Sequence, residues 1–156
     1  MIDDETSRLI AWSEELRRVH ERLRQALRLT RRAFDGGGDV HSASRELLLY
    51  CHGFCVALDE HHRAEDRTLF PAIEAANPQL APVLRALQQD HSMIAHLLSG
   101  LREATDGGAA PGVLASHVEG VAAIMESHFR YEERSLLAVL DTLELRAPTA
   151  EALGSI

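Results

Sequence analysis

The sequence predicts an all-α protein, an up-down-up-down four-helix bundle over residues 1–145 followed by a short C-terminal tail over residues 146–156. Three observations support this prediction. Breaks that contain glycine or proline divide the chain into four long stretches, these stretches are rich in Leu, Ala, Arg and Glu, and each carries apolar residues at helical spacing. No stretch shows the period-two alternation that is typical of a half-buried β-strand.

Short breaks separate the four predicted helices. They lie at residues 36–39, 77–78 and 105–112, and residues 147–148 begin the tail. Each break contains glycine or proline, which interrupt helices. Because short connections join helices that run antiparallel to each other, the spacing predicts neighbours that alternate in direction. Pro71 is expected to end or kink the second helix near its C-terminal end.

Each predicted helix has an apolar face with which it can pack against the others. Apolar residues recur every three or four positions, which places them on one side of a helix. In chain order, the four faces comprise Leu9, Trp12, Leu16, Leu23, Leu27 and Phe34; Leu47, Tyr50, Phe54, Leu58 and Leu69; Leu80, Leu84, Leu87, Ile94, Leu98 and Leu101; and Leu114, Val121, Met125, Leu136 and Val139. Four such faces can enclose one shared core.

The composition excludes several classes of protein. The chain of 156 residues is 46% hydrophobic, which is enough for one folded domain, and it has no apolar run long enough to cross a membrane. Its 24 acidic and 16 basic residues give a net charge of −8, which argues against nucleic acid as a partner. Cys51 and Cys55 are too few cysteines for a disulfide framework. The acidic N-terminal residues lack the pattern of a signal peptide, so we expect a cytoplasmic protein.

Histidines interrupt the apolar faces, one on each predicted helix: His20, His61, His91 and His128. At about 100° per residue, a side chain four positions after a histidine lies about 40° from it around the helix. Glu65 has this relation to His61, and Glu132 has it to His128. Six side chains that can bind a metal are therefore expected to face the axis of the bundle.

These six side chains favour a two-metal site. A glutamate in an apolar face is costly unless its charge is compensated. A single inward histidine is ordinarily a core residue, but four imidazoles and two carboxylates together suit a pair of iron or manganese ions bridged by the glutamates. The alternative is a metal-free helical interaction module that uses the arginine-rich first helix as its docking surface.

Three segments of the chain resemble the hemerythrin-like, or HHE cation-binding, family. They are residues 61–71 (HHRAEDRTLFP), 90–94 (DHSMI) and 128–133 (HFRYEE), and His20 stands where that family has its first-helix ligand. The similarity extends from residue 20 to residue 140. The resemblance implies a four-helix bundle with an oxo- or hydroxo-bridged diiron centre that binds dioxygen or a related small molecule. Manganese or zinc can substitute for iron at such ligands.

The sequence departs from the oxygen-carrying hemerythrins at two points. Those proteins have a second histidine four residues after the third-helix ligand, where this chain has Ala95. Their fourth-helix carboxylate follows its histidine by five residues, which would be Glu133, but helical phase favours Glu132 here. His62 lies about 100° from His61 around the helix and is a possible fifth nitrogen ligand.

The number of histidines bears on reactivity. Four histidines would divide two and two between the metals and leave an exchangeable position on each, which suggests a centre more reactive than a reversible oxygen carrier. The sequence therefore leaves three functions open: binding of dioxygen, peroxide or nitric oxide; a diiron enzyme with catalase-like or oxidase activity; and the metal-free module. It indicates no protein partner.

Overall fold

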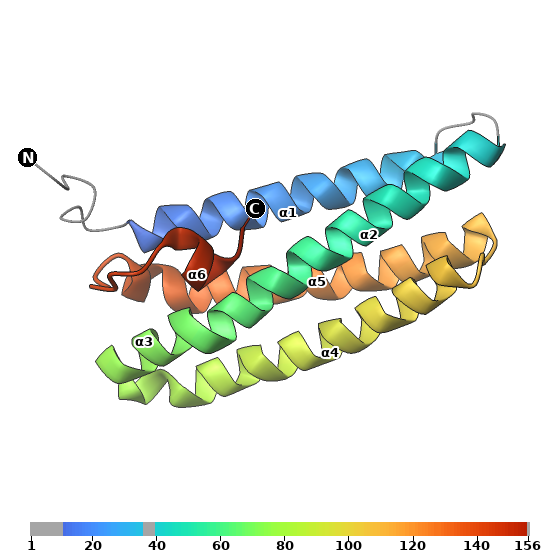
Figure 1. The fold of residues 1–156 in the computed structure, drawn as a ribbon. Helices are drawn as coiled ribbons and strands as arrows, with labels where there is room; N and C mark the ends of the chain where they lie inside the picture. The colour runs from blue at the N-terminus through green and yellow to red at the C-terminus, as the bar shows by residue number, and fades with distance from the viewer. Residues whose placement is uncertain (1–10, 36–39, 156) are drawn as a thin grey trace, which may run out of the picture.

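Four long helices lie side by side along most of the length of the molecule (Figure 1). The structure is a computed structural model that describes residues 11–35 and 40–155, with side chains described for residues 11–33 and 52–155. The long helices are α1 (Trp12–Asp35), α2 (Val40–Ala64), α4 (Ala81–Asp106) and α5 (Pro111–Leu140). Within the described ranges the chain has helices and no strands, which confirms the predicted all-α class.

The second predicted helix is divided into several helical segments. After α2 come a π-helical turn, η1 (Glu65–Leu69), then α3 (Phe70–Ala76), and the 3-10 turn η2 (Pro78–Leu80) leads into α4. The π-helical turn is wider than an α-helical turn, because the amide of Phe70 donates to the carbonyl of Glu65, five residues earlier instead of four. Pro71 lies in the first turn of α3, where its missing amide is tolerated. The proline thus follows the π-turn without ending the helical run.

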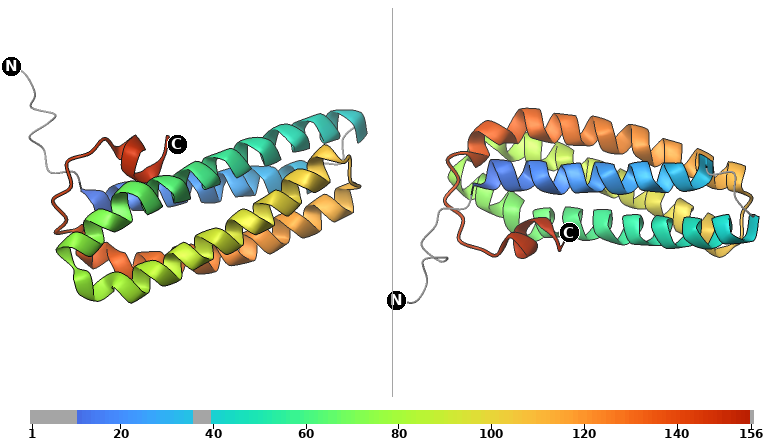
Figure 2. Two further views of the ribbon diagram at one scale, coloured as in Figure 1. Left: turned by 60° about the horizontal axis from the view of Figure 1, so that its bottom comes forward. Right: turned by 90° about the horizontal axis from the view of Figure 1, so that it is seen from above.

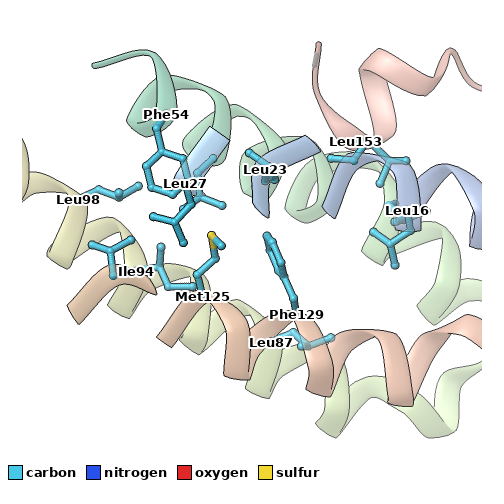
Figure 3. Close-up of a cluster of buried hydrophobic side chains, with 14 of the residues drawn as sticks. Leu16, Leu23, Leu27, Phe54, Leu87, Ile94, Leu98, Met125, Phe129 and Leu153 are labelled. Carbon is cyan, nitrogen blue, oxygen red and sulfur yellow. The ribbon is translucent and has the colours of Figure 1, made fainter. Parts of the chain in front are cut away.

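The long helices enclose one core. Helix α1 packs against α2 and α5, and α4 packs against α5 and α2; the two views in Figure 2 show the same arrangement from other sides. In the close-up, Leu27, Phe54 and Met125 gather in one region of the core, and Phe129 lies between Leu23 and Leu87 (Figure 3). The helices therefore bury the faces that the apolar spacing predicted.

Most of the predicted apolar faces are buried. Leu80 and Val139 are half-buried, and the side chains of Leu9, Phe34, Leu47 and Tyr50 lie outside the described residues. The buried members are Trp12, Leu16, Leu23, Leu27, Phe54, Leu58, Leu69, Leu84, Leu87, Ile94, Leu98, Leu101, Leu114, Val121, Met125 and Leu136.

The C-terminal residues fold back onto the bundle. Trp12 Nε1 donates a hydrogen bond of 3.1 Å to the carbonyl of Leu145, which holds the chain against the start of α1. The short helix α6 (Thr149–Leu153) then packs against α2, η1 and α1. Ala152 and Leu153 are fully buried, so the segment expected to be a tail contributes to the core.

None of the helices in residues 11–35 and 40–155 is both long enough and apolar enough to cross a membrane.

Candidate metal centre

The seven residues that the sequence indicated as candidate metal ligands all lie together in the interior. None has more than 5% of its surface exposed. They come from α1, α2, η1, α4 and α5, and they are His20, His61, His62, Glu65, His91, His128 and Glu132. The fold therefore concentrates five imidazoles and two carboxylates where water is largely excluded.

One group of possible ligands joins α1, α2, η1 and α5. It consists of His20, His61, Glu65 and Glu132, whose ligand atoms all lie within 4.8 Å of one another. His61 Nε2 is 3.2 Å from Glu65 Oε1, and His20 Nε2 is 3.7 Å from Glu132 Oε1. We call these four residues the first group.

The second group joins α2, η1, α4 and α5. It consists of His62, Glu65, His91 and His128, again within 4.8 Å of one another. His91 Nε2 lies 3.5 Å from Glu65 Oε1, so Glu65 belongs to both groups. His62, which the sequence left as a possible fifth nitrogen, is thus placed beside His91 and His128.

Glu132 also faces both groups. Its Oε1 points to His20 of the first group, and its Oε2 lies 3.1 Å from Nε2 of His128 in the second. Glu65 and Glu132 are therefore the two carboxylates with the geometry to bridge a pair of cations. The arrangement offers two nitrogen donors to one cation and three to the other.

Three of the histidines are oriented by carboxylates outside these groups. The pairs are His20 Nδ1 with Glu133 Oε1 at 2.9 Å, His91 Nδ1 with Asp66 Oδ1 at 2.8 Å, and His128 Nδ1 with Asp90 Oδ2 at 3.0 Å. An ionised carboxylate only accepts hydrogen bonds, so each Nδ1 carries a proton, and in the neutral imidazole Nε2 then presents its lone pair to the centre.

The orienting carboxylates were not predicted as such. Each is the immediate neighbour of a candidate ligand in the chain, since Asp66 follows Glu65 and Asp90 precedes His91. Glu133, next to Glu132, is also held by Arg24, whose Nη1 lies 3.1 Å from Glu133 Oε1. An acidic residue directly beside a candidate ligand was the feature of the sequence that could have indicated an orienting carboxylate. The sequence alone does not show which histidine that carboxylate reaches.

Buried polar atoms without partners show that the donor set suits a cation. In the described part of the chain, the Nε2 atoms of His20, His61 and His62 and all four carboxylate oxygens of Glu65 and Glu132 are buried and make no hydrogen bond. Leaving such groups unsatisfied is costly. Because they converge on two points, two metal ions would satisfy them together.

The facing pair His91 and His128 also indicates a cation site. Their Nε2 atoms are 3.1 Å apart, while both Nδ1 atoms are engaged by aspartates. With the protons held on Nδ1, two lone pairs face each other, and a proton or a cation between them is required to remove the repulsion. Imidazole and carboxylate donors are those that iron, manganese and zinc accept.

Burial sets the charge state of several groups. It lowers the pKa of His61 to about 3, helped by the charge of His20, and it lowers the pKa of His62 well below the usual value. Burial, followed by the negative charge of Glu132, raises the pKa of Glu65. For Glu133, burial acts to raise the pKa, but the hydrogen bonds from His20 and Arg24 outweigh burial and lower the pKa to about 2. Neutral imidazoles are the form that binds metals.

Aromatic contacts fix the orientation of the rings. Phe129 stacks on His20 with centroids 3.9 Å apart and planes inclined by 6°. Arg24 lies over the same phenyl ring, with Cζ 5.4 Å from its centroid. The first-helix histidine is therefore held by packing on its face as well as by Glu133 at its Nδ1.

An all-helical fold with histidines and bridging glutamates gathered in its core defines a helical-bundle protein that binds metal cations. A family model for the hemerythrin HHE cation-binding domain matches residues 13–140, and the chain belongs to that family. The family suggested by the three sequence segments is therefore confirmed. No match was found among curated proteins or among solved structures.

Proposed function

We propose that this protein is a non-haem diiron protein that binds dioxygen or a related small molecule, such as peroxide or nitric oxide. The observation that carries this proposal is the convergence of five buried imidazoles and two buried carboxylates on two adjacent points. Mixed imidazole and carboxylate donors in a helical bundle suit a pair of iron ions bridged by glutamates. Manganese or zinc could occupy the same donors.

The ligands divide unequally. His20 and His61 would hold one iron, and His62, His91 and His128 would hold the other. Glu65 and Glu132 would bridge the two ions, since each faces both groups. The metal held by two histidines has one fewer protein ligand, so the exchangeable position is expected there.

Two bound irons would supply redox chemistry at this site, and the chain supplies its surroundings. Met125 and Phe129 are fully buried one turn before and one residue after His128. Such apolar walls exclude bulk water and favour small, weakly polar molecules. The carboxylates of Asp66, Asp90 and Glu133 hold the Nδ1 protons, so that Nε2 of each partner histidine stays available to metal.

The arrangement of the helices is part of this proposal. We propose the up-down-up-down four-helix bundle, which is supported by the packing of α1 against α2 and of α4 against α5. In such a bundle each long helix turns one side towards the centre, so that α1, α2, α4 and α5 can each supply a histidine.

The unequal division bears on the enzymatic alternative. A catalase-like or oxidase activity was motivated by two histidines on each metal, with an exchangeable position on both. The placement of His62 in the second group gives three and two instead, and this favours a binding protein over that enzyme. The metal-free interaction module would leave the unpartnered buried atoms of Glu65 and Glu132 without a role.

Metal content per chain tests the proposal. Protein purified from iron-supplemented cells is expected to hold about two irons per chain by elemental mass spectrometry, as a bridged pair requires. A Glu65→Ala, Glu132→Ala double variant should take up little or none, whereas His96→Ala, on the exposed side of α4, should hold as much as the unmodified chain. Protein without iron, or with a substoichiometric mixture that mild chelation removes, would favour the interaction module.

A further inference from the structure

We propose that the C-terminal segment 149–154 is a positioning element of the metal centre, in which the main-chain carbonyl of Leu153 fixes the tautomer and the direction of the His61 ring. This inference rests on the proposed function, because it concerns how one candidate ligand is held. It assigns a role to residues outside the long helices and beyond residue 140, where the family match ends.

The contact itself is short and dry. His61 Nδ1 lies 2.7 Å from the carbonyl oxygen of Leu153, and both residues are fully buried. A carbonyl oxygen can only accept a hydrogen bond, so the Nδ1 of His61 must be the protonated nitrogen. The Nε2 lone pair is then directed at the first group, where Glu65 Oε1 lies 3.2 Å away. A carbonyl at this position therefore selects the tautomer whose Nε2 is free to bind a metal in the first group.

His61 differs from three other histidines in where this partner comes from. The Nδ1 partners of His20, His91 and His128 are carboxylates carried by α5, η1 and α4, within the helices that form the centre. The partner of His61 is 92 residues away in sequence and belongs to α6. The correct orientation of His61 thus depends on the docking of the C-terminal segment.

Gly154 allows the segment to approach closely enough. Its φ is +89°, in the region that favours glycine, and a Cβ atom there would lie only 3.1 Å from both the Cα and the N of His61. A side chain at residue 154 would therefore push the segment away from the backbone of α2. The displacement would act directly on the carbonyl of the preceding residue, Leu153.

Two further contacts hold the segment in place. Leu153 and Ala152 have no exposed surface, and Leu153 belongs to the main hydrophobic core (Figure 3). The connection that leads to α6 is held at Leu145 by Trp12 Nε1. The carbonyl is therefore presented by a packed segment, which is what pre-organised ligand positioning requires.

A pair of glycine variants tests this inference in the full-length chain. Gly154→Val places a side chain against His61, while Gly108→Val imposes similar backbone strain, at φ +67°, where a Cβ would meet nothing within 4 Å. Imidazole ¹⁵N shifts of the metal-free protein report the His61 tautomer, and chelator competition reports iron affinity. Gly154→Val should lose the Nδ1-protonated tautomer and bind iron about tenfold more weakly, with an altered visible spectrum of the loaded protein. Gly108→Val should retain both properties.

Each other result would overturn the inference. If Gly154→Val keeps the tautomer and the iron affinity, or changes the tautomer without weakening iron binding, the carbonyl of Leu153 does not position a ligand. If both variants lose iron equally, backbone strain and not the contact with His61 is the cause. Failure of the proposed function is recognised separately, because the unmodified chain would then bind no iron while the tautomer comparison in metal-free protein could still be made.

Discussion

The imidazole rings of His62 and His91 stack on each other, with centroids 3.9 Å apart and planes inclined by 11°. Phe70 lies against His91 in a similar orientation, with centroids 5.5 Å apart. This stack fixes His62 beside α4, while its neighbour His61 faces α1 and α5. Two consecutive residues of α2 thus lie in different groups, and His62 places an imidazole in the second group, where Ala95 of α4 has none to offer.

Replacing His62 tests whether it is a ligand. His62→Ala is expected to weaken iron binding in the second group and to change the visible spectrum of the loaded protein, because one of three nitrogen donors is removed. Iron per chain and the absorption spectrum measure this. His96→Ala removes an exposed imidazole from α4 and serves as the control. An unchanged spectrum in His62→Ala would exclude this residue from the ligand set.

The partly exposed aspartates are expected to influence metal affinity more than stability. Asp90→Ala removes the acceptor for His128 Nδ1 and should weaken iron binding about 10- to 100-fold, as loss of an orienting group typically does. Since the aspartate is 38% exposed, the free energy of unfolding of the metal-free protein should change by less than about 1 kcal/mol. Competition with a chelator and urea unfolding measure the two effects.

A matched control for Asp90→Ala is available on α2. Asp59 is also partly exposed and pairs with Arg63 one turn later, at 3.1 Å. In the described part of the chain, no ion pair between Asp59 and a candidate ligand is found. Asp59→Ala should leave iron affinity unchanged. Equal affinities in the two variants would mean that Asp90 does not orient His128.

Helical periodicity predicted much of this structure, for physical reasons. Helical phase places Glu132 on the inner face and Glu133 beside it, and the structure has Glu132 fully buried and Glu133 partly exposed. Such phase depends only on local geometry, so it can be worked out along one helix. The resemblance to the family rested on motifs that combine helical phase with residue type, and the match over residues 13–140 confirmed it.

Contacts between distant segments could not be predicted in the same way. The carbonyl of Leu153 reaches His61 from a segment with no periodic pattern, and every residue has a carbonyl, so no residue type marks it. The π-turn at Glu65 changes the helical phase just after His61 and His62, which single-helix arithmetic does not include. The position of His62 in the second group involves its stack with His91, which is a contact between two helices and cannot be worked out along one helix.

Neutralising one bridging carboxylate is expected to have opposite consequences with and without metal. Burial and the negative charge of Glu132 raise the pKa of Glu65 and so favour its neutral form in the metal-free protein. Glu65→Gln keeps that neutral state and the shape of the side chain, so the metal-free protein should be as stable as the unmodified one or more stable. With iron present, the variant should lack the metal-linked stabilisation, which is about 2.7 kcal/mol at a metal concentration 100 times the Kd. Urea unfolding with and without iron measures both. If the variant exceeds the unmodified protein in stability by the same amount with and without iron, then iron does not stabilise the unmodified protein. That result would favour the metal-free module.

Phe129 is expected to control the His20 ring without supplying a ligand atom. Phe129→Leu removes the stacked face, at 3.9 Å from the imidazole centroid, and should lower the free energy of unfolding by about 1–3 kcal/mol. Iron per chain should remain that of the unmodified protein, because no donor is lost, but the visible spectrum should shift as His20 gains freedom. Phe54→Leu is the control, since Phe54 is equally buried in α2 and no stacking contact with a candidate ligand is found for it. If both variants lose similar stability and neither changes the spectrum, Phe129 serves only as core packing, and Glu133 alone orients His20.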